Sequence, residues 1–339
     1  MNPKEYFSLK FENDELIFLD QTKLPLEEVY YITDDYERIA EAIEKLEIRG
    51  APLIGVAAAY ALTLTMKDVN SELIDNLFYK SFNRLKNTRP TAVNLFFALN
   101  EMKEVFDVSN KNKNIYNSLL KKAIQIHNDD IKKCDLIGQN GLKIFNKKST
   151  VLTHCNTGKL ATGGEGTAFN VIKQAYKTGL INFVYADETR PLLQGSRLTS
   201  FELEKEGIPF ALQIDSSAAS LFRSGKIDLV ITGADRIAAN GDTANKVGTY
   251  NLAVLCSYHK VPFYIAAPTT TIDKNIKSGE EIEIEYRKSE ELFNINGHKI
   301  IPNKFKTYTP AFDITTSKLI KGIITEEKVY EYPYNFNNE

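Results

Sequence analysis

Apolar residues in the first part of the chain recur at helical spacing. The clearest stripe consists of Tyr36, Ile39 and Ile43, which follow one another at steps of three and four residues. Asp34 and Asp35 precede this stripe, and aspartate is typical of a helix start because its carboxylate accepts a hydrogen bond from a first-turn N–H. We therefore predict a helix here, further helices over residues 52–66, 71–86, 92–105 and 115–145, and short strands over residues 7–9 and 16–19.

After residue 148 the pattern changes to short apolar runs that are separated by intervals of helix length. Such alternation is typical of a parallel sheet wrapped by helices. The runs are almost wholly apolar, as expected for strands that are covered on both faces. We predict strands over residues 151–155, 183–187, 210–215, 229–235 and 263–268. The fold class is therefore α/β, with a mainly helical domain that carries short strands over residues 1–147 and a parallel-sheet domain over residues 148–339.

Polar residues gather at the carboxyl ends of these predicted strands, where parallel sheets bind their ligands. They are His154, Cys155, Asn156, Asp187, Glu188, Arg190, Asp215, Asp235, Arg236, Pro268 and Thr269. Cys155 has two readings. It is either a small core residue or a thiolate stabilised by the backbone amides that follow it. His154 adjoins it on an extended segment, so the two side chains face opposite ways and His154 is more simply structural than part of a Cys–His pair.

Asp235 also leaves two alternatives open. A carboxyl group at the end of a buried strand is costly to desolvate, which raises its pKa and suits a proton donor at neutral pH. An ion pair with Arg236, or a cap on the following helix, explains the same residue without catalysis.

Several motifs are suited to binding an anion. Arg49 and Arg89 each precede a predicted helix, and Lys246 lies just before another that begins near Val247. The glycine-rich residues 158–166 lead into a predicted helix near Thr167, but they lack the spacing of a dinucleotide fingerprint or a P-loop. NAD and ATP are therefore disfavoured, and the glycines serve either an anion or the turns themselves.

Composition removes other classes of partner. The chain has 339 residues with 42 Lys and Arg against 44 Asp and Glu, so no basic surplus favours nucleic acid or an anionic membrane. The longest apolar run, residues 53–66, is shorter than the roughly 20 residues that cross a bilayer. The three cysteines lack the spacing of disulfide pairs or metal ligands, and no apolar signal core begins the chain. We therefore expect the protein in a reducing cytoplasm.

Five strings of residues resemble those of the methylthioribose-1-phosphate isomerases. They are RGAPLIGVAAAY from Arg49, RPTAVNL from Arg89, THCNTG from Thr153, ADETRPLLQG from Ala186 and GADRIAANGD from Gly233. The resemblance extends over nearly the whole chain, from Phe7 to Tyr330. It implies a Rossmann-like catalytic domain with a smaller, mainly helical amino-terminal domain that carries a short β-sheet, and a homodimer without metal or nucleotide cofactor.

The same resemblance implies an enzyme of methionine salvage that converts 5-methylthioribose 1-phosphate to 5-methylthioribulose 1-phosphate, with 5-deoxyribose 1-phosphate as a further substrate. It implies Cys155 and Asp235 as the catalytic pair, and it implies substrate contacts for Arg49, Gly50, Ala51, Arg89, Gln194, Asn245 and Lys246. Two alternatives share this fold. One is a ribose-1,5-bisphosphate isomerase, and the other is a non-catalytic regulatory subunit of the translation-initiation exchange factor that binds a sugar phosphate or nucleotide.

Overall fold

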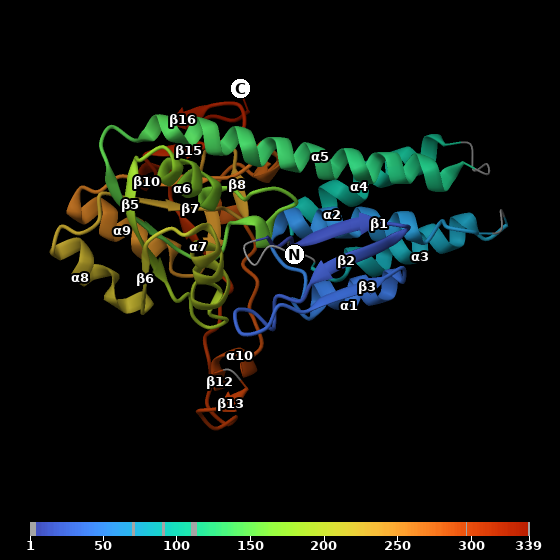
Figure 1. The fold of residues 1–339 in the computed structure, drawn as a ribbon, viewed down its shortest axis with the longest axis horizontal. Helices are drawn as coiled ribbons and strands as arrows, with labels where there is room; N and C mark the ends of the chain where they lie inside the picture. Colours follow the sequence, from blue (N-terminus) through green and yellow to red (C-terminus); the bar gives the residue numbers. More distant parts are fainter. Residues whose placement is uncertain (1–4, 70–71, 90–91, 110–113, 296, 338–339) are drawn as a thin grey trace. The chain divides into compact units, whose positions relative to one another are not determined.

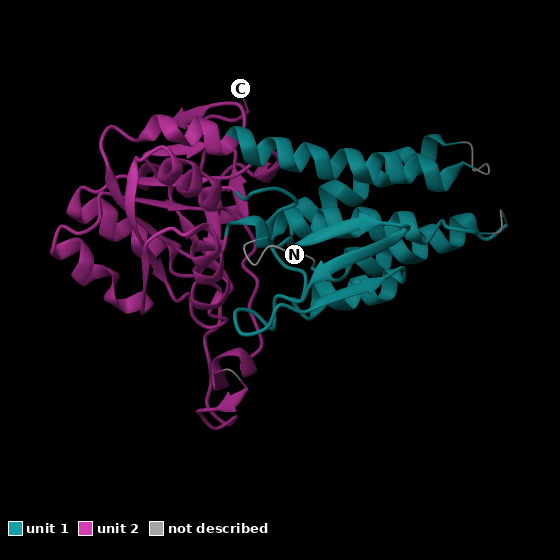
Figure 2. Ribbon diagram, in the orientation of Figure 1, with its two compact units in different colours: residues 1–136, 157–166 teal, residues 137–156, 167–339 magenta. Residues whose placement is uncertain are grey.

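A computed structural model describes residues 5–69, 72–89, 92–109, 114–295 and 297–337. Ser71 of one predicted helix, and residues 90–91 of the second arginine motif, lie outside this part. The chain forms two compact units (Figure 2): unit 1 contains residues 1–136 and 157–166, and unit 2 contains residues 137–156 and 167–339. Each unit is therefore built from two separate stretches of the sequence. The domain boundary expected after residue 147 stays a prediction.

Unit 1 combines a small antiparallel sheet with helices (Figure 1). The sheet has the order β1-β2-β3, with β1 at Leu9–Glu12, β2 at Glu15–Leu19 and β3 at Tyr30–Thr33. The helices are α1 (Tyr36–Glu44), α2 (Ala51–Leu64), α3 (Ile74–Lys86), α4 (Val93–Val108) and most of α5 (Ile115–Gly141). Asp35 caps α1 as predicted, because its Oδ1 accepts a 2.9 Å hydrogen bond from the Glu37 N–H.

Helix α2 lies at the centre of the core of unit 1. Residues 53–64 are all buried, so this helix is apolar around its whole circumference and is enclosed by other elements. Its close approach to α4 requires Gly55, because a Cβ atom there would lie 2.7 Å from the backbone oxygen of Asn94. The apolar run that we read as a buried helix is therefore one, and among the described residues no helix is long and apolar enough to cross a membrane.

Unit 2 is built on a seven-stranded sheet of order β16-β15-β10-β7-β4-β5-β6. All neighbouring strands are parallel except the edge pair β15 and β16. The strands are β4 (Ser149–Thr153), β5 (Ile181–Asp187), β6 (Phe210–Gln213), β7 (Leu229–Thr232), β10 (Phe263–Ala266), β15 (Gly322–Ile324) and β16 (Val329–Glu331). Since β4 comes first in the chain but lies between β5 and β7, the strand order reverses beside it, and such a reversal marks the usual ligand crevice.

Alternate residues of these strands enter two separate cores. In β7, Leu229 and Ile231 pack with α6 (Ala168–Lys177) and α7 (Ser200–Glu206), whereas Val230 packs with α8 (Ala218–Arg223) and α9 (Thr249–His259). Both faces of the sheet are thus covered by helices, which explains why the strand sequences are continuously apolar. The predicted α/β fold class is confirmed.

A second, four-stranded sheet in unit 2 escaped the sequence analysis. Its order is β11-β8-β9-β14, and its strands are β11 (Ile272–Asp273), β8 (Arg236–Ala238), β9 (Thr243–Lys246) and β14 (Phe312–Thr315). Strands of two to four residues are too short to show a period of two. The helix expected near Val247 therefore begins at Thr249, after β9.

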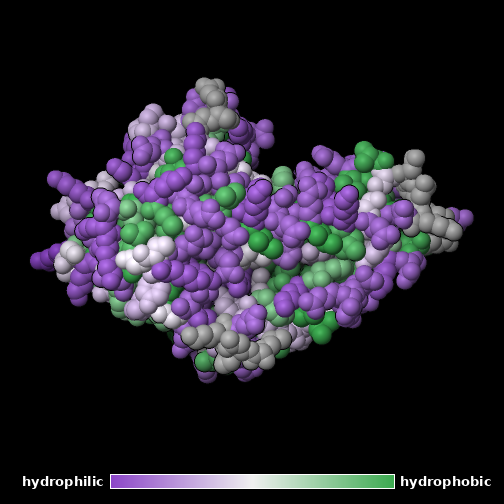
Figure 3. Space-filling model, turned by 45° about the horizontal axis from the view of Figure 1, so that its top comes forward, coloured by the Kyte–Doolittle hydropathy of each residue, from purple (hydrophilic) through white to green (hydrophobic). Residues whose placement is uncertain are grey.

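Unit 2 also contains a short hairpin of β12 (Asn294–Ile295) and β13 (His298–Lys299), with α10 (Glu290–Phe293) before it. On the face of the molecule drawn in Figure 3, hydrophilic residues predominate and apolar residues form smaller groups between them.

Candidate active site

Cys155 lies just beyond β4, at the point where the strand order reverses. The strand ends at Thr153 and not, as predicted, at Cys155, whose backbone is left-handed with φ 62°. A non-glycine residue in this region is strained and must be held by its surroundings. Two buried hydroxyls hold it: Thr189 Oγ1 accepts from the Cys155 N–H at 2.9 Å, and Thr199 Oγ1 donates to the Cys155 carbonyl at 2.5 Å. The local fold therefore fixes where this thiol is placed.

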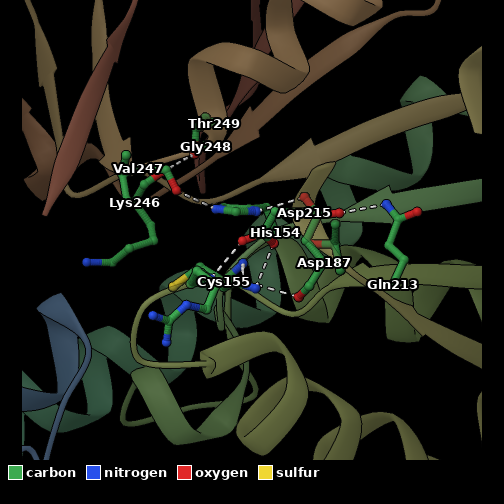
Figure 4. A network of polar contacts seen from close by, with 12 residues as sticks. His154, Cys155, Asp187, Gln213, Asp215, Lys246, Val247, Gly248 and Thr249 are labelled. Atoms are coloured by element: carbon green, nitrogen blue, oxygen red, sulfur yellow. Dashed lines mark hydrogen bonds and ion pairs between the residues drawn. The ribbon is translucent and has the colours of Figure 1, made fainter. Parts of the chain in front are cut away.

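His154 makes two hydrogen bonds through its ring (Figure 4). Its Nδ1 lies 2.8 Å from Asp187 Oδ2, and its Nε2 lies 2.9 Å from the Val247 carbonyl oxygen. His154 and Asp187 are each 1% exposed. Because a carbonyl oxygen only accepts, Nε2 carries a hydrogen, and the proton between Nδ1 and Asp187 makes the two residues a buried, proton-sharing pair.

The surroundings raise the pKa of both members of this pair. Burial by itself lowers the pKa of His154, but the hydrogen bond and charge of Asp187, with the charge of Asp215 and the Val247 carbonyl, raise that pKa overall. Burial also raises the pKa of Asp187, and the hydrogen bonds from His154 and Gln213 offset this rise only in part. Gln213 Nε2 donates to Asp187 Oδ1 at 2.6 Å, which favours the ionised carboxylate.

His154, Asp187 and Asp215 also place three potential ligand atoms within 4.8 Å of one another. They do not fit a bound cation, because both nitrogens of His154 are engaged with acceptors. Both oxygens of Asp215 accept backbone hydrogen bonds as well, from Thr189 at 2.8 Å and from Arg190 at 2.7 Å. The cluster therefore connects the carboxyl ends of β4, β5 and β6 by hydrogen bonds.

Asp235 lies between β7 and β8 in the same unit. Its backbone N–H donates to the Ala244 carbonyl at 2.9 Å, which pairs the segment with β9. The residue is half-buried and lies three residues past the end of β7, so the predicted strand through residue 235 was too long. A β-hairpin, rather than the end of a buried strand, therefore positions this carboxyl group.

Asn245 and Lys246 end strand β9. The Asn245 side chain is 4% exposed and donates to Thr249 Oγ1 at 2.9 Å, while that hydroxyl donates to the Lys246 carbonyl at 2.7 Å. Lys246 Nζ donates to the Ala311 carbonyl at 2.9 Å and lies 4.5 Å from the ring centre of Phe312. Both residues are thus held in place by β14 and by the start of α9.

Gln194 lies where the chain turns beside β5. It is 6% exposed, and among the described residues its Oε1 has no hydrogen-bond partner. The next residue must be glycine, because a Cβ at Gly195 would lie 1.6 Å from the Asp187 carbonyl oxygen. A buried acceptor of this kind is suited to a bound hydroxyl group or water.

The remaining predicted contacts belong to unit 1. Gly50 caps α2 with φ 99°, and a Cβ there would lie 2.4 Å from Cα of Ala161, in the glycine-rich segment that follows Cys155 and Asn156 in sequence. Arg49 and Arg89 are half-buried, and Ala51 is the first residue of α2. Unit 1 thus contains four of the predicted site residues, and unit 2 contains Cys155, Gln194, Asp235, Asn245 and Lys246.

The sequence analysis missed the hydroxyls of Thr189 and Thr199, which contact Cys155 across 34 and 44 residues of sequence. It counted Asp187 and Asp215 as candidates but assigned them no partner. Their partnership with His154 could have been inferred, because all three residues lie at the ends of adjacent strands.

Known proteins resemble this chain over nearly its full length. Residues 47–331 match the model of the initiation factor 2 subunit family. A methylthioribose-1-phosphate isomerase from Caldicellulosiruptor saccharolyticus is 50% identical over 97% of each chain.

Two solved structures are similar as well. The 5-methylthioribose 1-phosphate isomerase of Pyrococcus horikoshii has a TM-score of 0.92 and 39% identity, and the match covers 99% of this chain and 95% of that one. The structure described as translation initiation factor eIF-2B, subunit delta, from A. fulgidus has a TM-score of 0.87 and 35% identity, with 98% and 99% covered. The chain belongs to the methylthioribose-1-phosphate isomerases, within the initiation factor 2 subunit family.

Proposed function

We propose that this protein converts 5-methylthioribose 1-phosphate to 5-methylthioribulose 1-phosphate in methionine salvage. The observation that carries the proposal is the full-length likeness to isomerases of that name, at 50% identity over 97% of each chain. The geometry supports it, because Cys155 is held in a strained conformation at the reversal of strand order and Asp235 lies in the same unit.

We assign the acid step to Asp235. Phosphate occupies the anomeric oxygen of the substrate, so the ring cannot open by loss of a hydroxyl proton there. A carboxylic acid must instead protonate the ring oxygen as its bond to C1 breaks. Asp235, directly before β8 of the β8–β9 hairpin, is the candidate for this group.

We assign to Cys155 the transfer of the hydrogen from C2 to C1. Its thiolate removes that hydrogen as a proton, and the C–H electron pair forms the C1–C2 double bond while the C1–O bond electrons remain on the ring oxygen. The thiol then returns its proton to C1, and the C2 hydroxyl proton goes to the Asp235 carboxylate as the ketone forms. Both groups end in their starting protonation states, and no oxidant or reductant is needed.

Substrate contacts are assigned, as the family resemblance implies, to Arg49, Gly50, Ala51, Arg89, Gln194, Asn245 and Lys246. Arginine suits the phosphate because its planar fork gives charge-assisted, bidentate hydrogen bonds. The first turn of α2, which follows Gly50, adds backbone N–H groups that favour an anion. Phosphate binding is thereby used to orient C1 and C2.

The decisive experiment follows ketose formation from methylthioribose 1-phosphate by NMR. We expect Cys155→Ala and Asp235→Asn each to lower kcat about 10²- to 10⁴-fold, the usual contribution of a positioned acid or base. Cys256→Ala is the matched control, since Cys256 is 1% exposed within the core and burial raises its pKa. Failure of the wild-type protein to turn over this sugar or its 5-deoxy analogue contradicts the proposal.

Two further measurements refine the assignment. Competition between methylthioribose 1-phosphate and ribose 1,5-bisphosphate at equal concentration identifies the preferred sugar. Solvent deuterium in the product supports the proton route through Cys155, whereas a product free of deuterium supports transfer of the hydrogen as hydride.

The likeness to an eIF-2B delta subunit favours a second candidate, a regulatory subunit that binds without catalysis. Binding of a protein partner that persists in Cys155→Ala and Asp235→Asn, with no sugar turned over by the wild type, is the result expected from that function. We also propose a homodimer in the cytoplasm, for which sedimentation of the purified protein and cell fractionation are the tests.

A further inference from the structure

His154 lies between two segments that carry proposed site residues. On one side its Nδ1 bonds Asp187, whose backbone carbonyl accepts from the Thr189 hydroxyl at 3.2 Å. That hydroxyl in turn accepts from the Cys155 N–H at 2.9 Å. The side chain of Asp187 therefore fixes the residue before Cys155, and its backbone reaches Cys155 itself.

On the other side, His154 Nε2 bonds the carbonyl of Val247, the residue directly after Lys246. Figure 4 shows the ring of His154 with Val247, Gly248 and Thr249 on this side. Gly248 has φ 107°, and a Cβ there would lie 2.8 Å from Cε1 of the ring. The junction of β9 and α9 is therefore shaped around the imidazole of His154.

Charged groups lie around this arrangement at β5, β6, β9 and β14. Asp187 and Asp215 face His154 from the ends of β5 and β6. Asp313 on β14 accepts from the Gly248 N–H at 2.7 Å, and the charges of His154 and Lys246 both act on it. The imidazole is thus the one group bonded to both the Asp187 and the Val247 segments within the described network.

We propose that His154 is a positioning residue with two separable arms: Nδ1 sets Cys155 through Asp187, and Nε2 sets Asn245 and Lys246 through Val247. This inference rests on the proposed function, in which Cys155 moves a proton and the other two residues contact the substrate. The first arm therefore governs kcat, and the second governs KM.

Two amide substitutions separate the arms. In His154→Asn the side-chain amide occupies the place of Nδ1, so it keeps a donor for Asp187 and loses the bond to Val247. In His154→Gln the amide reaches the place of Nε2, so it keeps a donor for Val247 and loses the bond to Asp187. We expect His154→Asn to raise KM about tenfold with kcat little changed, and His154→Gln to lower kcat about 10- to 100-fold with KM little changed.

Asp187 provides an independent test of the first arm. Asp187→Ala removes the acceptor at Nδ1 and is expected to lower kcat without raising KM. Asp187→Asn restores a hydrogen-bonding side chain to both His154 and Gln213, so it is expected to recover at least tenfold of that loss. His259→Gln, at the carboxyl end of α9 and outside the described network, is the control.

The alkylation rate of Cys155 by iodoacetamide, followed by peptide mass spectrometry, gives a readout that does not need turnover. Loss of the Nδ1 arm in His154→Gln is expected to change this rate at least threefold, and His154→Asn is expected to leave it unchanged. If kcat and KM change in parallel in both amide variants, or if only thermal stability falls, the two-arm inference is wrong. A wild-type protein without isomerase activity overturns the proposed function instead, and the alkylation rates still test His154.

Discussion

The interior of unit 1 is stabilised by a different kind of contact from the carboxyl edge of the sheet in unit 2. Around α2, residues 53–64 are buried and Gly55 admits the backbone of α4, so shape and volume decide the packing. At the sheet edge, His154, Asp187 and Thr189 are buried and are placed by directional hydrogen bonds. Apolar packing tolerates small shifts of its side chains, whereas a buried polar group is costly as soon as its partner is displaced.

The largest expected loss of stability follows truncation of an aromatic residue in the core of unit 1. Phe106 is fully buried and stacks on Phe78 with ring centroids 3.7 Å apart. Phe106→Ala therefore removes apolar contacts and leaves a cavity, which we expect to lower the free energy of unfolding by about 3–5 kcal/mol. Urea denaturation measures this loss.

Phe106→Leu is the control for that substitution, because it fills more of the cavity and should cost markedly less. The activity per folded molecule should stay unchanged in both variants, since Phe106 belongs to no proposed site contact. An equal cost for the two variants contradicts the view that volume determines stability in this core.

The features that could be predicted from the sequence are those that repeat along it. The stripe of Tyr36, Ile39 and Ile43 predicted α1, and the apolar runs predicted the neighbouring parallel strands β10, β7, β4, β5 and β6 of unit 2. Strand β8, with three residues, and β11, with two, are too short to give such a signal. Their pairing is decided by contacts between segments far apart in the chain, which no local pattern records.

The candidate site could be predicted only as a set of residue types near strand ends. Cys155 and Asp235 were named in advance, but the left-handed backbone of Cys155 was not, because it depends on hydroxyls from Thr189 and Thr199. His154 was expected to be structural on the argument that neighbouring side chains alternate. Such alternation does not apply, because it assumes extended backbone through Cys155 and the strand ends at Thr153. The ring of His154 is nevertheless buried and hydrogen-bonded within the protein, to Asp187 and to Val247.

An intermediate effect is expected at Asp242, which joins three segments of unit 2. Its Oδ2 accepts from the Gly279 N–H at 3.0 Å, and its Oδ1 accepts from the Ser317 N–H at 2.8 Å. Asp242→Asn replaces one of these acceptors with an amide N–H that faces another donor. We expect the free energy of unfolding at neutral pH to fall by about 1.5–3 kcal/mol, the usual contribution of a hydrogen bond to a charged group.

The pH dependence of stability checks the same carboxylate. Burial raises the pKa of Asp242, but hydrogen bonds from Gly279, Ser317 and Asn240 outweigh it and lower the pKa below its usual value. A pKa that is lower in the folded state gives stability that is present above the unfolded value of 3.8 and is lost as the pH falls through the folded value. The Asn variant should lack this part of the acid dependence, and identical acid profiles for the two proteins contradict the assignment.

The smallest effect is expected at a polar contact of unit 1. Arg84 donates to both carboxylate oxygens of Glu44, at 2.7 and 3.0 Å, and these side chains are 27% and 41% exposed. Water and salt screen such a pair, so Glu44→Gln should cost no more than about 1 kcal/mol in the free energy of unfolding, and less at 1 M NaCl. Since the geometry of this bidentate pair is as good as that at Asp242, a difference in cost between the two variants isolates the contribution of burial and of backbone partners. An equal cost means that burial and backbone partners add no measurable stability at Asp242, and that the two polar contacts then stabilise their units alike.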